Sequence, residues 1–240
     1  LKKEEALSCA EAYCFSSAIY KQIFEKHHPT KPAHIIYDGA EPHLFFTPRS
    51  STKYDKPRIT LYLEALTAKN VEVLATALSA ISTLDSPIYC SVISDVAHHD
   101  AISSLQSIIA NMGLEHSVTL FGARDDMPAV WHHTDIAMLV SEDDASTYNG
   151  VCAMMAGVPL VCTPMHACCE IVENNKTGFI MEGATEKDFE ATIRGLLENP
   201  HKTRKVASAG QQVARFCYTL KENAQALYQI HKELFSNRIS

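Results

Sequence analysis

The stretch "SEDDASTYNGVCAMMAGVPLVCTP", residues 141–164, decides the fold class of this chain. Its carboxylates cluster before Ala145, and the helix-compatible run "VCAMMA" follows. Gly157 and Pro159 then end the helix and lead into a short apolar strand, "PLVCT". The apolar run "IAMLV" at 136–140 precedes the acidic loop. This order of strand, acidic loop, helix and strand is typical of a parallel α/β unit.

The same alternation continues on both sides of this stretch. Strands are expected at 34–38, 58–63, 87–94, 117–121, 136–140, 159–163 and 178–182. Helices are expected near 70–82, 100–113, 125–133, 148–156 and 167–174. The pattern predicts a Rossmann-like, doubly wound parallel sheet with helices on both faces, flanked by terminal helices. In such sheets ligands bind at the carboxyl ends of the strands, here the loops after residues 63, 94, 121, 140 and 163.

The two ends of the chain depart from the alternation. Residues 4–27 are expected to form one long helix, and residues 185–236 two or three helices separated at the Asn-Pro pair 199–200 and near residue 218. The polar segment 47–57 holds two prolines and no apolar period, so we expect an exposed loop.

Composition excludes several classes of protein. The 240 residues are 46% hydrophobic and 20% charged, which fits one large domain or one domain with an appendage. The net charge of −7 and the absence of a Lys/Arg cluster argue against nucleic-acid binding. The longest apolar runs have strand length, too short to span a bilayer. The eight cysteines include no CxxC pair, which favours a reducing cytoplasm.

The histidines and cysteines show no metal-binding spacing. The adjacent pairs at 98–99 and 132–133 do not match a zinc pattern, and "HACCE" at 166–170 has no second cluster that would complete four ligands. We therefore predict no metal and no cofactor.

Four segments carry a resemblance to a known family. They lie in the family's order along the chain, and "IIYDGAEPHLF" is similar to the family pattern "viyNGvDpelF". The four segments are residues 35–45, 111–141, 152–161 and 168–181. The chain resembles the C-terminal, donor-binding domain of retaining GT-B glycosyltransferases, especially glycosyltransferase family 4.

The resemblance implies a domain organisation. Residues 1–30 would come from the end of an N-terminal acceptor domain or the interdomain region, and residues 31–200 would form the nucleotide-sugar-binding domain. Residues 201–240 would pack back on that domain or towards the N-terminal one. The acceptor, an unknown glycan, lipid or protein, would bind mainly in the domain before Leu1, which could also associate with the cytoplasmic face of a membrane.

The family signature, two Glu separated by seven residues, falls on Asp144 and Cys152. The resemblance implies that the first position holds hydroxyls of the donor sugar and the second the ribose. Asp144 is alternatively a helix cap, and Cys152 a buried small thiol. Cys152 offers only a weak donor where the family has a carboxylate.

The other roles implied by the resemblance concern the nucleotide. Backbone amides around Thr147, Tyr148 and Asn149 would face a diphosphate at a helix N-terminus. The family has a glycine at the position of Thr147. Phe121 and Gly122 would lie near the base, or else form only a strand-end turn.

Lys69 would neutralise the leaving diphosphate, or else be a solvated lysine before a helix. Glu64 and Ala65 stand where the family has Gly and Arg, so one of two cations is replaced. Glu170 has a donor-site role or a structural one.

Three functions remain open. The first is an active, retaining nucleotide-sugar transferase, which we favour. The second is a catalytically inactive relative that acts as a structural or regulatory partner of an active transferase; Ala65, Thr147 and Cys152 favour it. The third, a GT-B epimerase, is disfavoured by "AMMAGVPLV" at 153–161.

Overall fold

The computed structural model describes residues 10–45, 56–85, 87–140, 146–164 and 166–239. Asp144 therefore lies outside the described residues. The loop expected at 47–57 also lies outside them, except for its last two residues.

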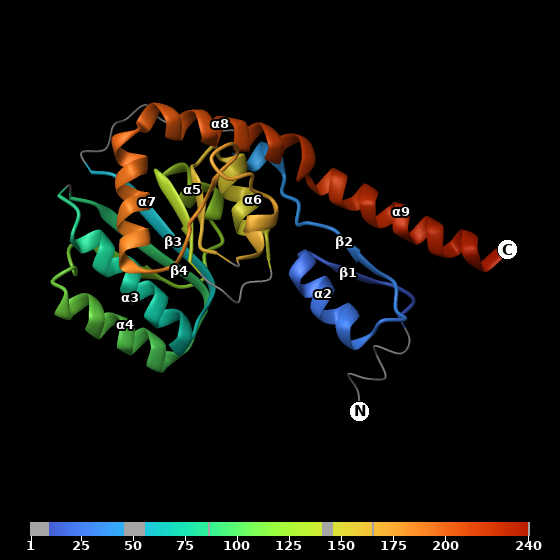
Figure 1. The fold of residues 1–240 in the computed structure, drawn as a ribbon, viewed down its shortest axis with the longest axis horizontal. Helices are drawn as coiled ribbons and strands as arrows, with labels where there is room; N and C mark the ends of the chain where they lie inside the picture. The colour runs from blue at the N-terminus through green and yellow to red at the C-terminus, as the bar shows by residue number, and fades with distance from the viewer. Residues whose placement is uncertain (1–9, 46–55, 86, 141–145, 165, 240) are drawn as a thin grey trace.

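Six parallel strands form the central sheet, in the order β5-β4-β3-β6-β7-β8 (Figure 1). Their bounds are Arg58–Leu66 for β3, Tyr89–Ala97 for β4, Val118–Phe121 for β5, Ile136–Leu139 for β6, Leu160–Cys162 for β7 and Phe179–Ile180 for β8. Numbered from β3, this order is 3-2-1-4-5-6, that of a doubly wound sheet. The predicted fold class is confirmed.

Helices cover both faces of the sheet. One core contains side chains of α3 (Ala68–Ser82), α4 (His99–Asn111) and α7 (Glu186–Glu198) together with Leu61 and Leu63. The other contains side chains of α5 (Met127–His132), α6 (Tyr148–Met155) and α8 (Pro200–Cys217) together with Tyr62. Neighbouring residues of β3 thus enter opposite cores, because successive side chains of a strand alternate.

Of the predicted helix over residues 4–27, the described part is confirmed for residues 18–27 and wrong before them. Residues Tyr13–Phe15 form strand β1, and helix α2 spans only Ala18–His27. The reason is Ser17, whose extended backbone and side-chain bond to the Ile19 N–H cap a helix that starts at the next residue.

The first expected strand also lies elsewhere. Strand β2, Ala33–Ile35, pairs with β1 in a separate two-stranded parallel sheet and not with the central sheet. We call β1, α2 and β2 the N-terminal unit. The rings of Tyr13 and Phe15 lie 4.4 and 5.1 Å from that of Phe24, so aromatic packing holds this unit together.

A third expectation, a helix over 167–174, is also wrong. Only the 3₁₀ turn η2, Ala167–Glu170, forms there. Ile171 caps this turn, and Asn174 forms a β-bridge with Gly178, so residues 171–174 lead into a turn and not a helix.

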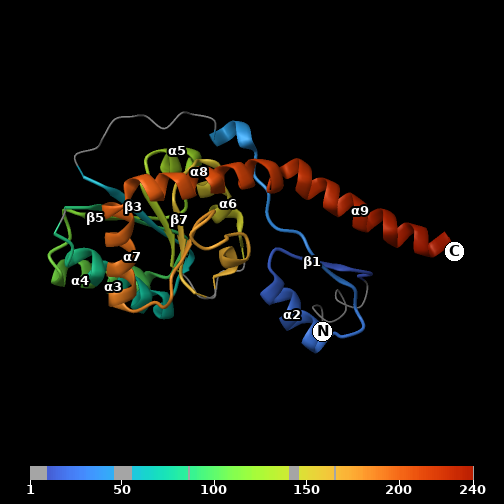
Figure 2. The ribbon, with the colours of Figure 1, turned by 45° about the horizontal axis from the view of Figure 1, so that its top comes forward.

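The C-terminal helices are separated where the sequence predicts. Helix α7 ends before Asn199 and Pro200, and α9 (Leu220–Ile239) follows α8 after a break at Tyr218. Both ribbon views show α9 leaving the six-stranded sheet on the side of the N-terminal unit (Figures 1 and 2). None of the helices described is long and apolar enough to cross a membrane.

Candidate functional site

A small recess lies where the strand order of the sheet reverses. Strands β3 and β6 are neighbours, but their crossover connections lead to opposite sides, which opens a crevice beyond their carboxyl ends. The recess is lined by Tyr62, Glu64, Leu139, Ser146, Asn149 and His166. Strand ends, the N-terminus of α6 and the segment after β7 therefore meet at the position where open α/β sheets bind ligands.

The N-terminus of α6 is held by a carboxylate from far away in the sequence. Asp38 Oδ2 accepts hydrogen bonds from Thr147 N (2.7 Å), Thr147 Oγ1 (3.0 Å) and Ser146 Oγ (3.2 Å). Asp38 N in turn donates to Thr147 Oγ1 (3.1 Å), and Thr147 is fully buried. We did not assign Asp38 a role from the sequence; the available signal was an aspartate in place of the Asn of the family pattern.

Tyr148 and Cys152 face each other one turn apart on α6. Tyr148 is exposed, whereas Cys152 is 1% exposed and hydrogen-bonded to it. Burial raises the pKa of Cys152 to about 12. Repulsion from the Cys152 sulfur, and then burial, raise the pKa of Tyr148 to about 12. At neutral pH both groups are uncharged, and the Cys152 thiol packs inside the domain.

Three thiols gather beneath α6. Cys162 is hydrogen-bonded to both Cys168 and Cys169, and His166 Nδ1 accepts from Cys168 N at 3.0 Å. Burial opposes ionisation of Cys168, but bonds from Cys162 and from the Gly150 N–H lower its pKa to about 6. Among the described residues, no three His, Cys, Asp or Glu side chains are arranged to hold a metal ion.

Helix α6 can approach these thiols only because of Gly150. A Cβ at this position would lie 2.4 Å from Cys168 Sγ. The glycine therefore allows the backbone of the first turn to pack directly against the sulfur.

Glu170 contacts the N-terminal unit. Its carboxylate accepts bonds from Ser17 Oγ (2.9 Å), Ala18 N (2.6 Å) and Ile19 N (3.1 Å), the first donors of α2. The pKa of the nearby Tyr37 is raised by burial and then by the Glu170 charge. The structural alternative for Glu170 thus has direct geometric support, while its donor-site role stays a prediction.

Lys69 is exposed in the first turn of α3, which follows β3 at the carboxyl edge of the sheet. Glu64 lines the recess, whereas Ala65 pairs with Val96 inside the sheet, and its carbonyl oxygen accepts from Asn70 Nδ2 at 2.8 Å. The structure therefore places Lys69 on the same edge as the recess.

Phe121 and Gly122 lie at the same edge but further out. Strand β5 is the outer strand, two positions from β3, roughly 10 Å at ordinary strand spacing. Phe121 borders a groove of about 580 Å³ along the face of β3, β4 and β5. The Arg124 guanidinium lies 5.1 Å from the Phe121 ring centroid and is fixed by two bonds to Asp126, of 2.7 and 2.6 Å.

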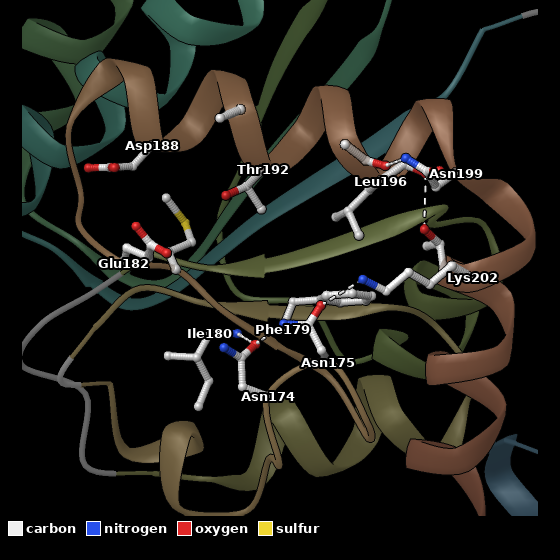
Figure 3. A pocket seen from close by; sticks show the side chains of 14 residues that line it. Asn174, Asn175, Phe179, Ile180, Glu182, Asp188, Thr192, Leu196, Asn199 and Lys202 are labelled. Atoms are coloured by element: carbon white, nitrogen blue, oxygen red, sulfur yellow. Dashed lines mark hydrogen bonds between the residues drawn. The ribbon is translucent and has the colours of Figure 1, made fainter.

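A different groove, of about 500 Å³, opens between β8, α7 and the start of α8 (Figure 3). None of the predicted site residues lines it. Lys202 Nζ donates to Asn175 Oδ1 at 3.1 Å, and Ile180 N to Asn174 Oδ1 at 3.0 Å. Because these polar groups bind one another, we assign them to holding the loop and helix ends together.

Comparison with known proteins identifies the fold and the family. The family model "Glycosyl transferases group 1" matches residues 45–213. No curated protein matches the sequence. A glycosyltransferase from Rickettsia africae is similar in structure, with a TM-score of 0.82 and 19% identity over 95% of this chain and 64% of that protein.

Two further solved structures have the same fold. Anabaena HepE, in complex with UDP and glucose, gives a TM-score of 0.80 with 20% identity, covering 95% of this chain and 64% of HepE. The sucrose-phosphate synthase from Thermosynechococcus elongatus gives 0.81 with 15% identity, covering 98% of this chain and 61% of the synthase.

The chain thus spans less than two thirds of the length of these proteins. The fold is that of a Rossmann-like GT-B domain, and the family match extends over most of the chain. The chain belongs to the group 1 glycosyl transferases.

Proposed function

We propose that this chain is the donor-binding part of a retaining, family 4-like glycosyltransferase. It binds a nucleoside-diphosphate sugar at the crevice between β3 and β6 and serves transfer of a hexose to a glycan, lipid or protein. The observation that carries this proposal is the N-terminus of α6 at the switch point of the sheet, in a chain of this family. The UDP and glucose bound by HepE support a nucleotide-sugar donor.

Different residues at the carboxyl edge of the sheet bind different parts of the donor. The amides of Thr147, Tyr148 and Asn149 face the diphosphate, where the helix dipole favours negative charge. Lys69 supplies the cation that offsets charge developing as the glycosidic bond breaks, and Asp144 binds hydroxyls of the sugar. Phe121 and Gly122 border the base.

Two positions of the proposed site, Ala65 and Cys152, lack the side chains that the family pattern has there. Cys152 is buried and bonded to Tyr148, so a ribose contact needs a rearrangement of the first turn of α6. The replaced cation at Ala65 also slows transfer, because one electrostatic donor contributes roughly 10²–10³ in rate. These two observations favour the alternative, a catalytically inactive relative that acts as a partner of an active transferase.

Calorimetric titration with UDP, GDP and ADP tests the proposal. Micromolar binding of one nucleotide is expected, weakened about tenfold by Lys69→Ala, because a charge-assisted contact is lost. The matched control is Lys187→Ala, since Lys187 is exposed and is the second residue of α7, as Lys69 is of α3. Binding should then be followed by a transfer assay on the full-length protein.

Two results would count against the proposal. Absence of heat with all three nucleotides, from a sample shown to be folded, favours the inactive partner. Equal weakening by Lys69→Ala and Lys187→Ala would remove Lys69 from the site, because a general charge effect would then explain both.

A further inference from the structure

The end of α6 that faces the recess already holds an anion. Asp38 supplies this negative charge from the segment that follows the N-terminal unit, 109 residues before Thr147. Three donors on Ser146 and Thr147 converge on one oxygen of its carboxylate. One of these donors is the backbone N–H of Thr147, the kind of group that a helix N-terminus offers to a bound phosphate.

Other donors at this helix end also have acceptors within the chain. Tyr148 N donates to Ser146 Oγ at 3.1 Å, and Gly150 N bonds the Cys168 sulfur. Together with Thr147 N, three backbone N–H groups of this end are therefore engaged. A diphosphate that uses this end must compete for them.

The backbone that carries Asp38 is pinned in place. Ala40 N donates to Tyr218 O at 3.0 Å, Leu220 N to Ala40 O at 3.3 Å, and Asn223 Nδ2 to Tyr37 O at 2.9 Å. A Cβ on Gly39 would lie 2.5 Å from Thr219 O, so the chain here packs directly on the junction of α8 and α9. The carboxylate is held at the helix by its own backbone and is not a freely moving surface group.

We propose that Asp38 determines the affinity of the donor site, because its carboxylate occupies the phosphate position at the N-terminus of α6 and a nucleoside diphosphate must displace it. The inference rests on the proposed function and adds to it a residue that weakens donor binding. Two anions at one helix end repel each other, and the helix dipole is fully effective for only one of them. Glu64, which lines the same recess, adds to the negative charge.

The test compares Asp38→Asn with the unchanged chain. Asn keeps the shape and one oxygen that can accept from Thr147 N, but removes the charge. Calorimetry is done with inorganic pyrophosphate and with UDP, GDP and ADP. Pyrophosphate and the preferred nucleotide should both bind about tenfold more tightly to the variant.

Asp188→Asn is the matched control. Asp188 is also a carboxylate that accepts bonds at a helix N-terminus, from Thr185 N (2.9 Å) and Thr185 Oγ1 (2.6 Å) at the start of α7. The Asp188→Asn substitution removes the same charge at another helix and should leave the affinities for pyrophosphate and the nucleotides unchanged. Asp38→Ser, with a smaller polar side chain, is the second variant, and thermal melts verify folding of each.

Each outcome decides between the inference and the proposed function. Equal affinities in Asp38→Asn and the unchanged chain overturn the inference and leave the proposed function standing; so does tightening that Asp188→Asn reproduces. If pyrophosphate binds more tightly to Asp38→Asn than to the unchanged chain but no nucleotide binds to either, the result supports the inference and contradicts the proposed function. Failure of every protein to bind any probe contradicts both. If both Asp38 variants are unfolded, the carboxylate is structural and the inference is overturned.

Discussion

Replacing Glu170 by Gln should loosen the N-terminal unit without disturbing the sheet. The Glu170 carboxylate accepts from Ser17 Oγ and Ile19 N through Oε1 and from Ala18 N through Oε2. It therefore joins the first turn of α2 to η2, 152 residues further along the chain. Gln can keep one oxygen on two of these donors, but its amide nitrogen then faces the third N–H.

The size of the effect follows from the bonds lost. In Glu170→Gln one charge-assisted hydrogen bond is lost, and an amide N–H of Gln faces the N–H of Ala18 at a part-buried position. Together these changes lower the free energy of opening α2 by about 2 kcal/mol. This free energy corresponds to a roughly 30-fold increase in the opening of α2, since about 1.4 kcal/mol is a factor of ten.

Hydrogen exchange read by mass spectrometry measures this opening directly. Peptides that cover residues 13–27 should exchange roughly 30-fold faster in Glu170→Gln, while those from β3 and β6 keep their rates. The control is Glu173→Gln, because within the described residues the exposed Glu173 carboxylate pairs with Lys176, three residues away, and has no bond to α2. Unchanged protection of α2 in Glu170→Gln, or equal loss in both variants, would show that the Glu170 carboxylate does not hold α2 in place.

Two further predictions concern packing and ionisation. Gly210→Ala should lower the free energy of unfolding in urea by about 1–3 kcal/mol, because its Cβ would lie 2.2 Å from Thr177 O. Gly195→Ala should raise the free energy of unfolding by about 0.5–1 kcal/mol, because nothing lies within 4 Å of its Cβ; a loss of stability in Gly195→Ala would contradict this prediction. Thiolate absorbance at 240 nm should titrate near pH 6, because the pKa of Cys168 is lowered from 9.0 to about 6, and Cys168→Ser should reduce this change to the part contributed by Cys169, whose pKa is also lowered. A lowered pKa means that this ionisation stabilises the folded chain fully above pH 9 and that the contribution is lost as the pH falls through about 6; no titration below pH 8 would contradict it.

The central sheet could be predicted because its signals are local. The runs at 136–140 and 159–163 are continuously apolar, as strands buried on both faces require, and Gly157 and Pro159 separate helix from strand. The four segments that resemble the family then extended the predicted α/β fold over most of the chain. The strand order was not predicted from the sequence, because no single residue encodes it; the order found is that of a doubly wound sheet.

The N-terminal unit could not be predicted because its structure depends on distant partners. The apolar spacing of residues 4–27 fits a helix, but β1 forms by pairing with β2 across the intervening helix α2. The contacts of Asp38 with Thr147 and of Glu170 with Ser17 span 109 and 153 residues. Side-chain capping over such separations leaves no periodic pattern in a sequence, so the partners of Asp38 and Glu170 could not be predicted, although a structural role was one alternative for Glu170.

The most direct test of donor binding at α6 is an amide NMR titration of the chain with the nucleotide that calorimetry selects. We expect the largest shift changes at the amides of Thr147, Tyr148 and Asn149, with smaller ones near Lys69 and at Phe121 and Gly122. Changes confined to the groove of β8, α7 and α8, at Asn175 and Lys202, or no changes at all, would contradict a donor site at the crevice between β3 and β6.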